Sequence, residues 1–265
     1  MLLAVSRSVW SYRGFIAGSV KREFQARYRN SMLGALWTVI NPLAMILVYT
    51  VIFSQVMRAR LPGVDDSLAY SVFLCAGLIT WGLFSEIIGR SLSMFLDNAN
   101  LLKKLSFPRI CLPLIVILNA CANFAIILAL FLGFLLITGR LPGMALIALP
   151  ALLLIQLLFC VGLGMVLGIL NVFFRDVGQF FGIALQFWFW LTPIVYPLSI
   201  LPAGIRQLVS LNPMTPLMHA YQEVFLSGAW PDWSSLLPIA VLGLILCVCG
   251  LALFRARSGE MVDEL

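Results

Sequence analysis

Residues 27–37 read Arg27-Tyr28-Arg29-Asn30-Ser31-Met32-Leu33-Gly34-Ala35-Leu36-Trp37 and join a basic, aromatic segment to an apolar one. The apolar segment continues to Met57 without a formal charge. A charged side chain is costly at the centre of a bilayer but is tolerated at its edge. This junction therefore predicts the point at which the chain enters a membrane, and Arg27 and Arg29 predict the side from which it enters.

The composition indicates a membrane protein with several spans. Of the 265 residues, 62% are hydrophobic and 11% are charged, whereas a soluble domain averages about 45–50% apolar and about 25% charged residues. The net charge of +6 fits Lys and Arg retained on the cytoplasmic side of a membrane, so we expect no nucleic-acid partner.

The N-terminal segment predicts an amphipathic helix that lies in the plane of the membrane surface. Its apolar residues recur at spacings of three and four: Val9, Tyr12, Ile16, Val20, Phe24 and Tyr28. Gly14 and Gly18 could break this helix in two. The alternative is an amphipathic helix that lies in the cytosol.

Six apolar stretches follow, and they predict an all-α polytopic fold with six spans. The stretches are Leu33–Met57, about Leu68–Leu92, Ile110–Ile137, about Met144–Phe173, about Val177–Trp190 and Ser235–Phe254. The first contains Asn41-Pro42, which predicts a kink. With a cytoplasmic N-terminus, thirteen of the 17 Lys and Arg residues fall on the cytoplasmic side, so we expect both termini there.

The region from Ile194 to Trp233 is apolar and rich in proline but too interrupted for a span. Pro202–Leu211 and Pro216–Leu226 each predict a short helix that starts at a proline, separated by Asn212-Pro213. We expect two helices that dip into the outer side of the membrane, because non-helical backbone at that depth must be buried in protein. A loop lying flat on the surface is the alternative.

The chain has no G-x-x-x-x-G-K-[ST] motif, so ATP-driven transport would need a separate ATPase subunit. The second cytoplasmic loop predicts a short helix on which such a subunit could dock, with Asp near its start and Lys at its end. The candidate docking residues are Asp97, Asn98, Leu101, Leu102, Lys103 and Lys104, together with Arg175 and Asp176 in a short turn. The alternatives are a solvated loop helix and a plain turn.

Four motifs carry a family resemblance: Arg27–Trp37 followed by Asn41-Pro42, Leu101–Pro113 (LLKKLSFPRICLP), Phe174-Arg175-Asp176-Val177 and Asn212-Pro213-Met214-Thr215-Pro216. Their order resembles the ABC-2 family of exporter permeases. Within it, the chain is most similar to the membrane subunit of polysaccharide exporters, which move O-antigen, capsule or teichoic acid.

The resemblance implies a homodimer of six-span subunits with two copies of an ATPase, in the bacterial inner membrane. ATP and Mg would bind the partner, and this chain would hold no cofactor. It also implies one domain over residues 1–265: a cytoplasmic interface helix (1–31), a six-span region (32–254) and a cytoplasmic tail (255–265). A coupling helix at about 97–106 and periplasmic gate helices at about 203–226 are expected, with the first and fifth spans lining a channel.

Three sets of site residues follow from this reading. We expect the anionic head of a lipid-linked polysaccharide to meet Arg7, Arg13, Lys21, Arg22, Arg27, Arg29 and Trp37. Aromatic rings bind the apolar faces of sugars, and Tyr49, Phe187, Trp188, Trp190 and Tyr196 are the candidates for lining the channel; the alternative is an interfacial aromatic belt. Arg206, His219 and Glu223 are the candidate gate residues.

Other side chains carry weaker expectations. We expect no metal site, because the six cysteines lie in or beside apolar segments and the single His has no ligand cluster. Glu86 and Arg90 are one helical turn apart and predict a pair, structural or functional. Gly164 with Gly168, and Gly178 with Gly182, predict close helix contacts within or between subunits.

The leading hypothesis is therefore a permease for lipid-linked polysaccharide, most specifically O-antigen. An ABC-2 exporter of teichoic acid, capsule, or a small lipid or drug remains open, as does an ATP-independent channel. A membrane-embedded transferase would need an acid–base constellation, and Asp65-Asp66 is the only close acidic pair before the C-terminal segment. The sequence does not identify the polymer.

Overall fold

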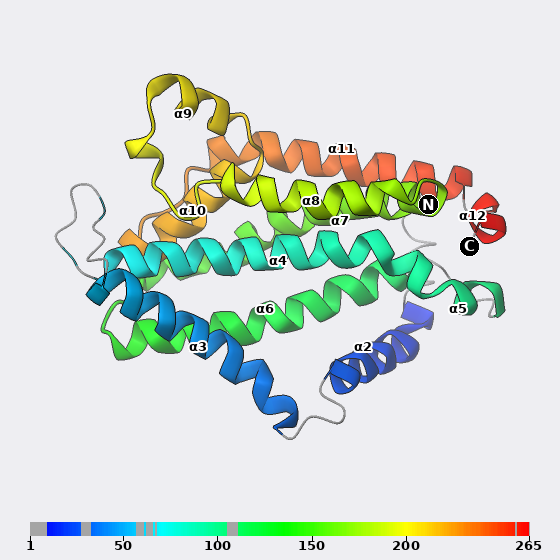
Figure 1. Cartoon of the computed structure of the whole chain (residues 1–265), viewed down its shortest axis with the longest axis horizontal. Coiled ribbons are helices and arrows are strands. Elements are labelled where there is room, and N and C mark those ends of the chain that lie inside the picture. The colour runs from blue at the N-terminus through cyan, green and yellow to red at the C-terminus, as the bar shows by residue number, and fades with distance from the viewer. Residues whose placement is uncertain are drawn as a thin grey trace.

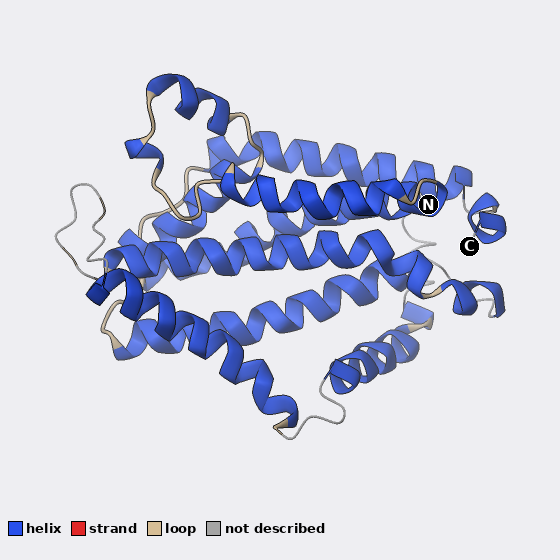
Figure 2. Ribbon diagram, viewed as in Figure 1, coloured by secondary structure: helices blue, strands red, loops and turns tan. Residues whose placement is uncertain are grey.

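The computed structural model describes residues 10–27, 33–56, 61, 66, 68–104, 111–257 and 259–264. In these ranges the chain forms helices joined by loops and turns, without a strand (Figure 2). The expected all-α class is therefore confirmed for the described part of the chain. The helices and their bounds are α2 Arg13–Arg27, α3 Trp37–Val51, α4 Ala69–Asp97, α5 Ala99–Lys104, α6 Cys111–Ile137, α7 Leu149–Phe173, α8 Asp176–Trp190, α9 Ala203–Ser210, α10 Met214–Ser227, α11 Trp233–Arg257 and α12 Glu260–Glu264.

Two of these helices are extended by other helical turns. A π-helical segment, Ile52–Val56, continues α3, and a 3-10 segment, Gly143–Ala148, leads into α7. Pro42 lies inside α3, which continues through it. Within the described residues, five helices are long and apolar enough to cross a membrane: Trp37–Ser54, Ala69–Asp97, Cys111–Ile137, Gly143–Phe173 and Trp233–Arg257. The protein is thus a multi-pass membrane protein.

The expected fifth span is shorter than the sequence suggested. It corresponds to α8, whose 15 residues extend for about 22 Å at 1.5 Å per residue. The hydrocarbon core of a bilayer is about 30 Å thick. A helix of this length does not cross alone, so the six-span topology stays a prediction.

The long helices form a bundle around α4, which packs against α6, α7, α8 and α10. The helices α2, α5 and α12 lie at one end of the bundle, and α9 and α10 lie at the other (Figure 1). The pairs α7–α11 and α4–α7 have the most extensive contacts.

Glycine allows the backbones of α7, α4 and α11 to approach closely. A Cβ atom added to Gly168 would lie 2.5 Å from the carbonyl oxygen of Ser91, and one added to Gly164 would lie 2.6 Å from Ser91 Oγ. The Gly164–Gly168 face therefore packs within the chain, against α4. Gly182 on α8 has nothing within 4 Å of an added Cβ, so its face is uncovered in the described chain.

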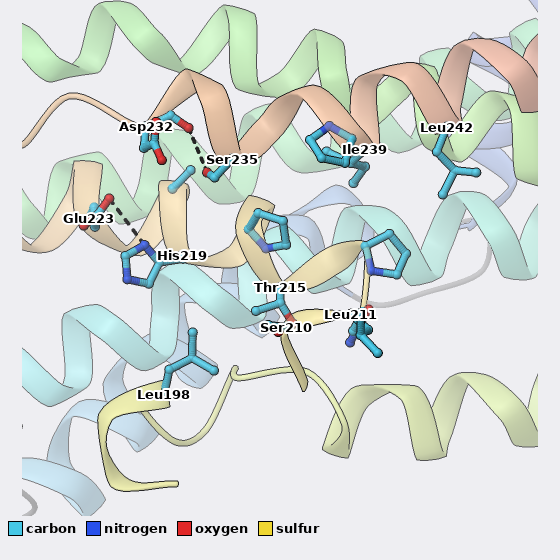
Figure 3. A pocket seen from close by; sticks show the side chains of 15 residues that line it. Leu198, Ser210, Leu211, Thr215, His219, Glu223, Asp232, Ser235, Ile239 and Leu242 are labelled. Atoms are coloured by element: carbon cyan, nitrogen blue, oxygen red, sulfur yellow. Dashed lines mark hydrogen bonds and ion pairs between the residues drawn. The ribbon is translucent and has the colours of Figure 1, made fainter. Parts of the chain in front are cut away.

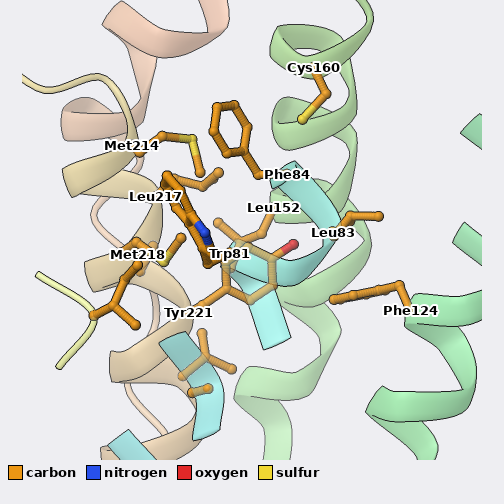
Figure 4. Packing of buried hydrophobic residues seen from close by; sticks show 14 of the residues in the cluster. Trp81, Leu83, Phe84, Phe124, Leu152, Cys160, Met214, Leu217, Met218 and Tyr221 are labelled. Carbon is orange, nitrogen blue, oxygen red and sulfur yellow. The ribbon is translucent and has the colours of Figure 1, made fainter. Parts of the chain in front are cut away.

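The main core joins α10 to the bundle. Met214, Leu217, Met218 and Tyr221 of α10 pack with Trp81 and Phe84 of α4, and with Leu152 and Cys160 of α7 (Figure 4). A flat surface loop is therefore the wrong reading for α10, whereas α9 is exposed except for Val209. The helix α10 begins at Met214 and not at Pro216. Pro216 is tolerated in the first turn, because the N–H that proline lacks would have no partner there.

Candidate substrate-access and coupling surfaces

The N-terminal helix α2 packs on the first turns of α6. Ile16 is buried with Cys111 and Ile115 of α6, and Tyr12 and Val20 pack at the margin of this cluster. Three residues of the expected apolar face therefore pack against protein, whereas Val9, Tyr28 and the side chain of Phe24 lie outside the described part of the chain. The break expected at Gly14 and Gly18 is wrong, because α2 is continuous from Arg13 to Arg27.

A polar network joins α2 to α4 and α6. Glu23 of α2 forms an ion pair with Arg90 of α4 and accepts a hydrogen bond of 2.8 Å from Asn119 Nδ2 of α6. Arg90 Nη1 also lies 3.9 Å from Glu86 Oε1, and Asn123 Nδ2 donates to Glu86 Oε2 at 2.7 Å. The expected pair of Glu86 and Arg90 therefore exists, but at the outer limit of an ion pair.

Sequence reasoning missed Glu23. It is the only acidic residue before Asp65, and it sits among the cations of α2. That isolation is the signal that could have singled it out, although nothing local identifies its partner 67 residues away.

Three of the expected head-group residues are exposed on α2. The Arg13 guanidinium lies 4.8 Å from the centre of the Trp10 ring, and Arg22 Nη2 donates to Ser19 Oγ at 2.8 Å. Lys21 is exposed as well. Trp37 begins α3 and is partly exposed. The structure describes only the backbone of Arg27, and the predictions for Arg7 and Arg29 fall outside the described residues.

The aromatic end of α8 has two faces. Trp188 points into the bundle: its ring lies 5.1 Å from that of Phe84, and its Nε1 donates to Asn212 Oδ1 at 2.8 Å. Phe187 and Trp190 point outward and keep 67% and 64% of their surface exposed. The candidate aromatic residues are therefore divided between a structural face and an uncovered one.

The remaining aromatic candidates, Tyr196 and Tyr49, lie outside α8. Tyr196 OH donates to the carbonyl oxygen of Trp190 at 2.8 Å, which holds the loop after α8 against the helix end. Tyr49 is half-buried on α3, and its ring lies 6.3 Å from that of Phe53. Phe180 and Ile183 extend the outward face of α8. That this face lines a channel stays a prediction.

The expected docking helix exists as α5, but it starts two residues later than Asp97. Asp97 ends α4 and accepts a hydrogen bond of 2.6 Å from Ser93 Oγ. Asn98 separates the helices, because its Nδ2 donates to the Met94 carbonyl oxygen at 2.8 Å and so caps α4. The helix α5 therefore carries Leu101 to Lys104 but neither Asp97 nor Asn98.

The helix α5 has one buried and one exposed side. Leu102 is buried and Lys103 is exposed, while the side chains of Leu101 and Lys104 lie outside the described part. Leu102 shares its cluster with Met261 of α12. Within the segment expected to be a cytoplasmic tail, Glu260–Glu264 forms the helix α12, which packs on α5 and α7.

The short turn between α7 and α8 is held by Asn171. Its Nδ2 donates to the carbonyl oxygen of Leu92 at 2.8 Å, and its Oδ1 accepts from the backbone N–H of Gly178 at 2.7 Å. Arg175 lies in this turn and Asp176 begins α8, and both side chains are exposed. The two side chains do not form an ion pair with each other.

At the opposite end of the bundle, α9, α10 and the start of α11 surround a groove of about 700 Å³ (Figure 3). His219 and Glu223 line it, with His219 Nδ1 3.4 Å from Glu223 Oε2. Arg206 donates instead to the carbonyl oxygens of Ser199 and Leu201, both at 3.1 Å. The structure thus brings together two of the three candidate gate residues.

Asp232 lines the same groove just before α11. Hydrogen bonds from the Ser234 hydroxyl and backbone N–H hold the pKa of Asp232 below its usual range. Asp232 therefore stays ionised and caps the helix. Among the described residues, no group of three or more His, Cys, Asp or Glu side chains could hold a metal ion.

Comparison with known proteins identifies the family. Residues 16–226 match the model of the ABC-2 type transporter family. The chain is 35% identical to the O-antigen export system permease protein RfbA of Myxococcus xanthus, over the full length of both chains. It is 31% identical to a protein of the same name from Klebsiella pneumoniae, over 92% of each chain.

A more distant relative is the polysialic acid transport protein KpsM of Escherichia coli, which is 26% identical over 92% of this chain and 93% of that one. The matches extend over both candidate surfaces, from α2 through α5 to α10. The chain therefore belongs to the ABC-2 type transporter family.

Proposed function

We propose that the chain is the permease subunit of an ATP-driven exporter that moves lipid-linked O-antigen across the bacterial inner membrane. The observation that carries this proposal is the 35% identity with an O-antigen export permease over the full length of both chains. A separate ATPase would supply the energy and would bind ATP and Mg. We expect the whole chain to act as a single transmembrane domain.

The orientation follows from the distribution of cations. Lys21, Arg22 and Lys103 lie on α2 and α5, at the end of the bundle that also holds α12. Arg140 and Arg206 lie in the loop after α6 and on α9, toward the other end. The positive-inside rule supports a cytoplasmic location for the first end and for both termini.

The course of the chain supports a sixth crossing. The end of α7 lies at the α12 end of the bundle, because α12 packs on α7 and α5. The chain must then reach the opposite end, where α11 begins beside the groove. The intervening crossing would be α8 together with the segment that follows it, where Thr192 and Ile194 are completely buried. Irregular backbone is tolerated at membrane depth when protein buries it.

A second copy of the chain would cover the outward faces of α3 and α8. Met45 and Val48 of α3, and Phe180, Phe187 and Trp190 of α8, are exposed apolar side chains. A passage between two such faces would present aromatic rings to a glycan without binding it tightly. Tyr49 and Tyr196 would lie at its margin, and α9 and α10, with Arg206, His219 and Glu223, would limit leakage at the outer end.

The cations of α2 would meet the anionic head of the lipid carrier. Arg13, Lys21 and Arg22 are exposed on α2, which precedes α3 in the chain, and α3 begins at Trp37. Cations near the membrane surface attract anionic lipid groups by about 1 kcal/mol each. The exposed part of α5, with Lys103, together with Arg175 and Asp176, would contact the ATPase at the same end.

Deletion of the gene tests the function. We expect O-antigen to disappear from the cell surface while lipid-linked glycan accumulates in the cytoplasmic leaflet, and we expect the wild-type gene to reverse both effects. Normal surface O-antigen in the deletion strain would contradict the proposal. Loss of a capsular polymer instead would favour the second candidate, a capsule permease, which the similarity to KpsM supports.

A further inference from the structure

The docking of α2 on the bundle combines the apolar cluster of Ile16, Cys111 and Ile115 with a charged contact that is only half withdrawn from solvent. Glu23 pairs with Arg90 and accepts a hydrogen bond from Asn119. The side chains of Glu23 and Arg90 keep 43% and 27% of their surface exposed. A pair of this kind adds a modest attraction to the apolar packing of α2 on α6, so breaking the pair itself costs little.

Arg90 has a second carboxylate within reach. Its Nη1 lies 3.9 Å from Glu86 Oε1 and makes no hydrogen bond in the described part of the chain. Asn123 Nδ2 holds the other oxygen of Glu86 at 2.7 Å. Because Glu86 lies on α4 itself, it stays beside Arg90 whatever the position of α2.

The position of Arg90 makes an unpaired charge costly. It lies seven residues before Asp97, the last residue of α4, which is about 10 Å along the helix axis. Arg90 keeps 27% of its side-chain surface exposed, but its Nη1 atom is buried, and the charge on this buried side loses its compensation if Glu23 leaves. If α2 moved away with Glu23, Arg90 would need another anion nearby.

We propose that Arg90 is a positioning residue that exchanges one carboxylate for the other. While α2 is docked on α6, Arg90 pairs closely with Glu23 and lies 3.9 Å from Glu86; when α2 is displaced, it closes on Glu86 alone. The charge of Arg90 is compensated in both positions, so α2 has two discrete positions on the bundle. Linking this exchange to ATP rests on the proposed function, whereas the docking equilibrium of α2 does not.

The alternative is a static tie, in which Arg90 only holds Glu23 and Glu86 takes no part. The two arrangements predict opposite behaviour for Glu86. Under exchange, Glu86 competes with Glu23 for Arg90 and favours displacement of α2. Under a static tie, loss of the Glu86 charge leaves docking unchanged or weakens it.

A native cysteine reports the docking of α2. Cys111 has no exposed surface and packs with Ile16 of α2, so it should react with a soluble maleimide only when α2 is displaced. The experiment uses the full chain in complex with its ATPase in nanodiscs, with and without a non-hydrolysable ATP analogue. Peptide mass spectrometry separates the labelling of Cys111 from that of the other cysteines.

Two single variants test the exchange. Glu23→Gln should speed the labelling of Cys111 by about three- to tenfold, because it weakens docking. Glu86→Gln should slow labelling by about threefold, because it removes the partner of the displaced state. Gln25→Ala, at an exposed position of α2, is the matched control and should leave the rate unchanged. An unchanged or faster rate in Glu86→Gln would overturn the proposal.

A charge swap, Glu23→Arg with Arg90→Glu, separates the tie from the exchange. The swap rebuilds the contact between α2 and α4, so Cys111 should be protected without nucleotide. Displacement of α2 would then leave Glu86 and the new glutamate together without a cation, so any labelling that the ATP analogue induces should be lost. A swap that restored both properties would overturn the exchange.

The proposed function can fail separately. If the wild-type complex shows no change with the ATP analogue but the two single variants still shift labelling in opposite directions, the exchange is supported and its link to the ATPase is refuted.

Discussion

Met261 of α12 is 1% exposed and lies in the same buried cluster as Leu102 of α5. The end of the chain therefore supports the helix that we assign to ATPase docking. A motion of the ATPase that reaches α5 would also act on α12 and on the end of α7, because α12 packs on both helices.

We predict that Met261→Asp uncouples the ATPase from export. A carboxylate in this apolar cluster would be desolvated without a partner, so α12 should detach from α5. The complex should still assemble, with ATP hydrolysis retained and export reduced at least fivefold. Met261→Leu is the control, because it preserves the volume and apolar character of the side chain. Full export with Met261→Asp would show that α12 is dispensable.

Asn171→Leu should lower the thermal unfolding temperature of the purified protein. It removes the hydrogen bonds to Leu92 and Gly178 and leaves the backbone groups of both residues without these partners. The loss should be about 1–3 kcal/mol. Gln179→Leu, at an exposed position of α8, tests whether any added leucine has this effect; equal shifts would contradict the role of Asn171 as a clamp between helices.

Gly168→Ala should destabilise the bundle by about 1–3 kcal/mol, because its Cβ would meet backbone, 2.5 Å from the Ser91 carbonyl oxygen. Gly182→Ala should not, since an added Cβ has nothing within 4 Å. Thermal unfolding in detergent measures both. If Gly182→Ala instead changed the dimer content on size-exclusion chromatography, it would support a subunit contact at that face of α8.

Trp188 and Trp190 should behave differently when changed. Trp188→Phe removes the donor to Asn212 and should reduce stability by about 1 kcal/mol. Trp190→Ala should leave the fold intact, because the side chain projects outward, but should reduce export if this face lines the passage. Unfolding curves and surface glycan, measured on both variants, distinguish these effects; normal export with Trp190→Ala would favour an aromatic belt facing lipid.

Much of the helical framework was predictable from the sequence. Hydropathy places Ile110–Ile137 almost where α6 runs, from Cys111 to Ile137. Pro202 correctly marks the start of α9, because proline ends one segment and favours the first turn of the next. The predicted helix boundary was wrong at Asn98, where a side chain caps the helix. The pattern of apolar residues carries no information about the hydrogen bond that forms this cap.

The candidate site was predictable only in part. Helical geometry requires that neighbouring residues such as Trp188 and Trp190 point in different directions, but only the packing of α4 decides which one is buried. The contact between Glu23 and Arg90 joins helices that are distant in the sequence, so local pattern pointed to the nearer Glu86. The position of α12 on α5 is likewise a tertiary contact without a local signal.

The most direct test of the central claim is transport by the purified complex in proteoliposomes. The chain would be reconstituted with its ATPase and a lipid-linked O-antigen, and the glycan that becomes accessible on the opposite leaflet would be measured. We expect ATP-dependent transfer that disappears when the ATP-binding lysine of the ATPase is replaced. Transfer that is equally fast without ATP, or ATP hydrolysis without any transfer of the glycan, would contradict the assignment as an ATP-driven polysaccharide permease.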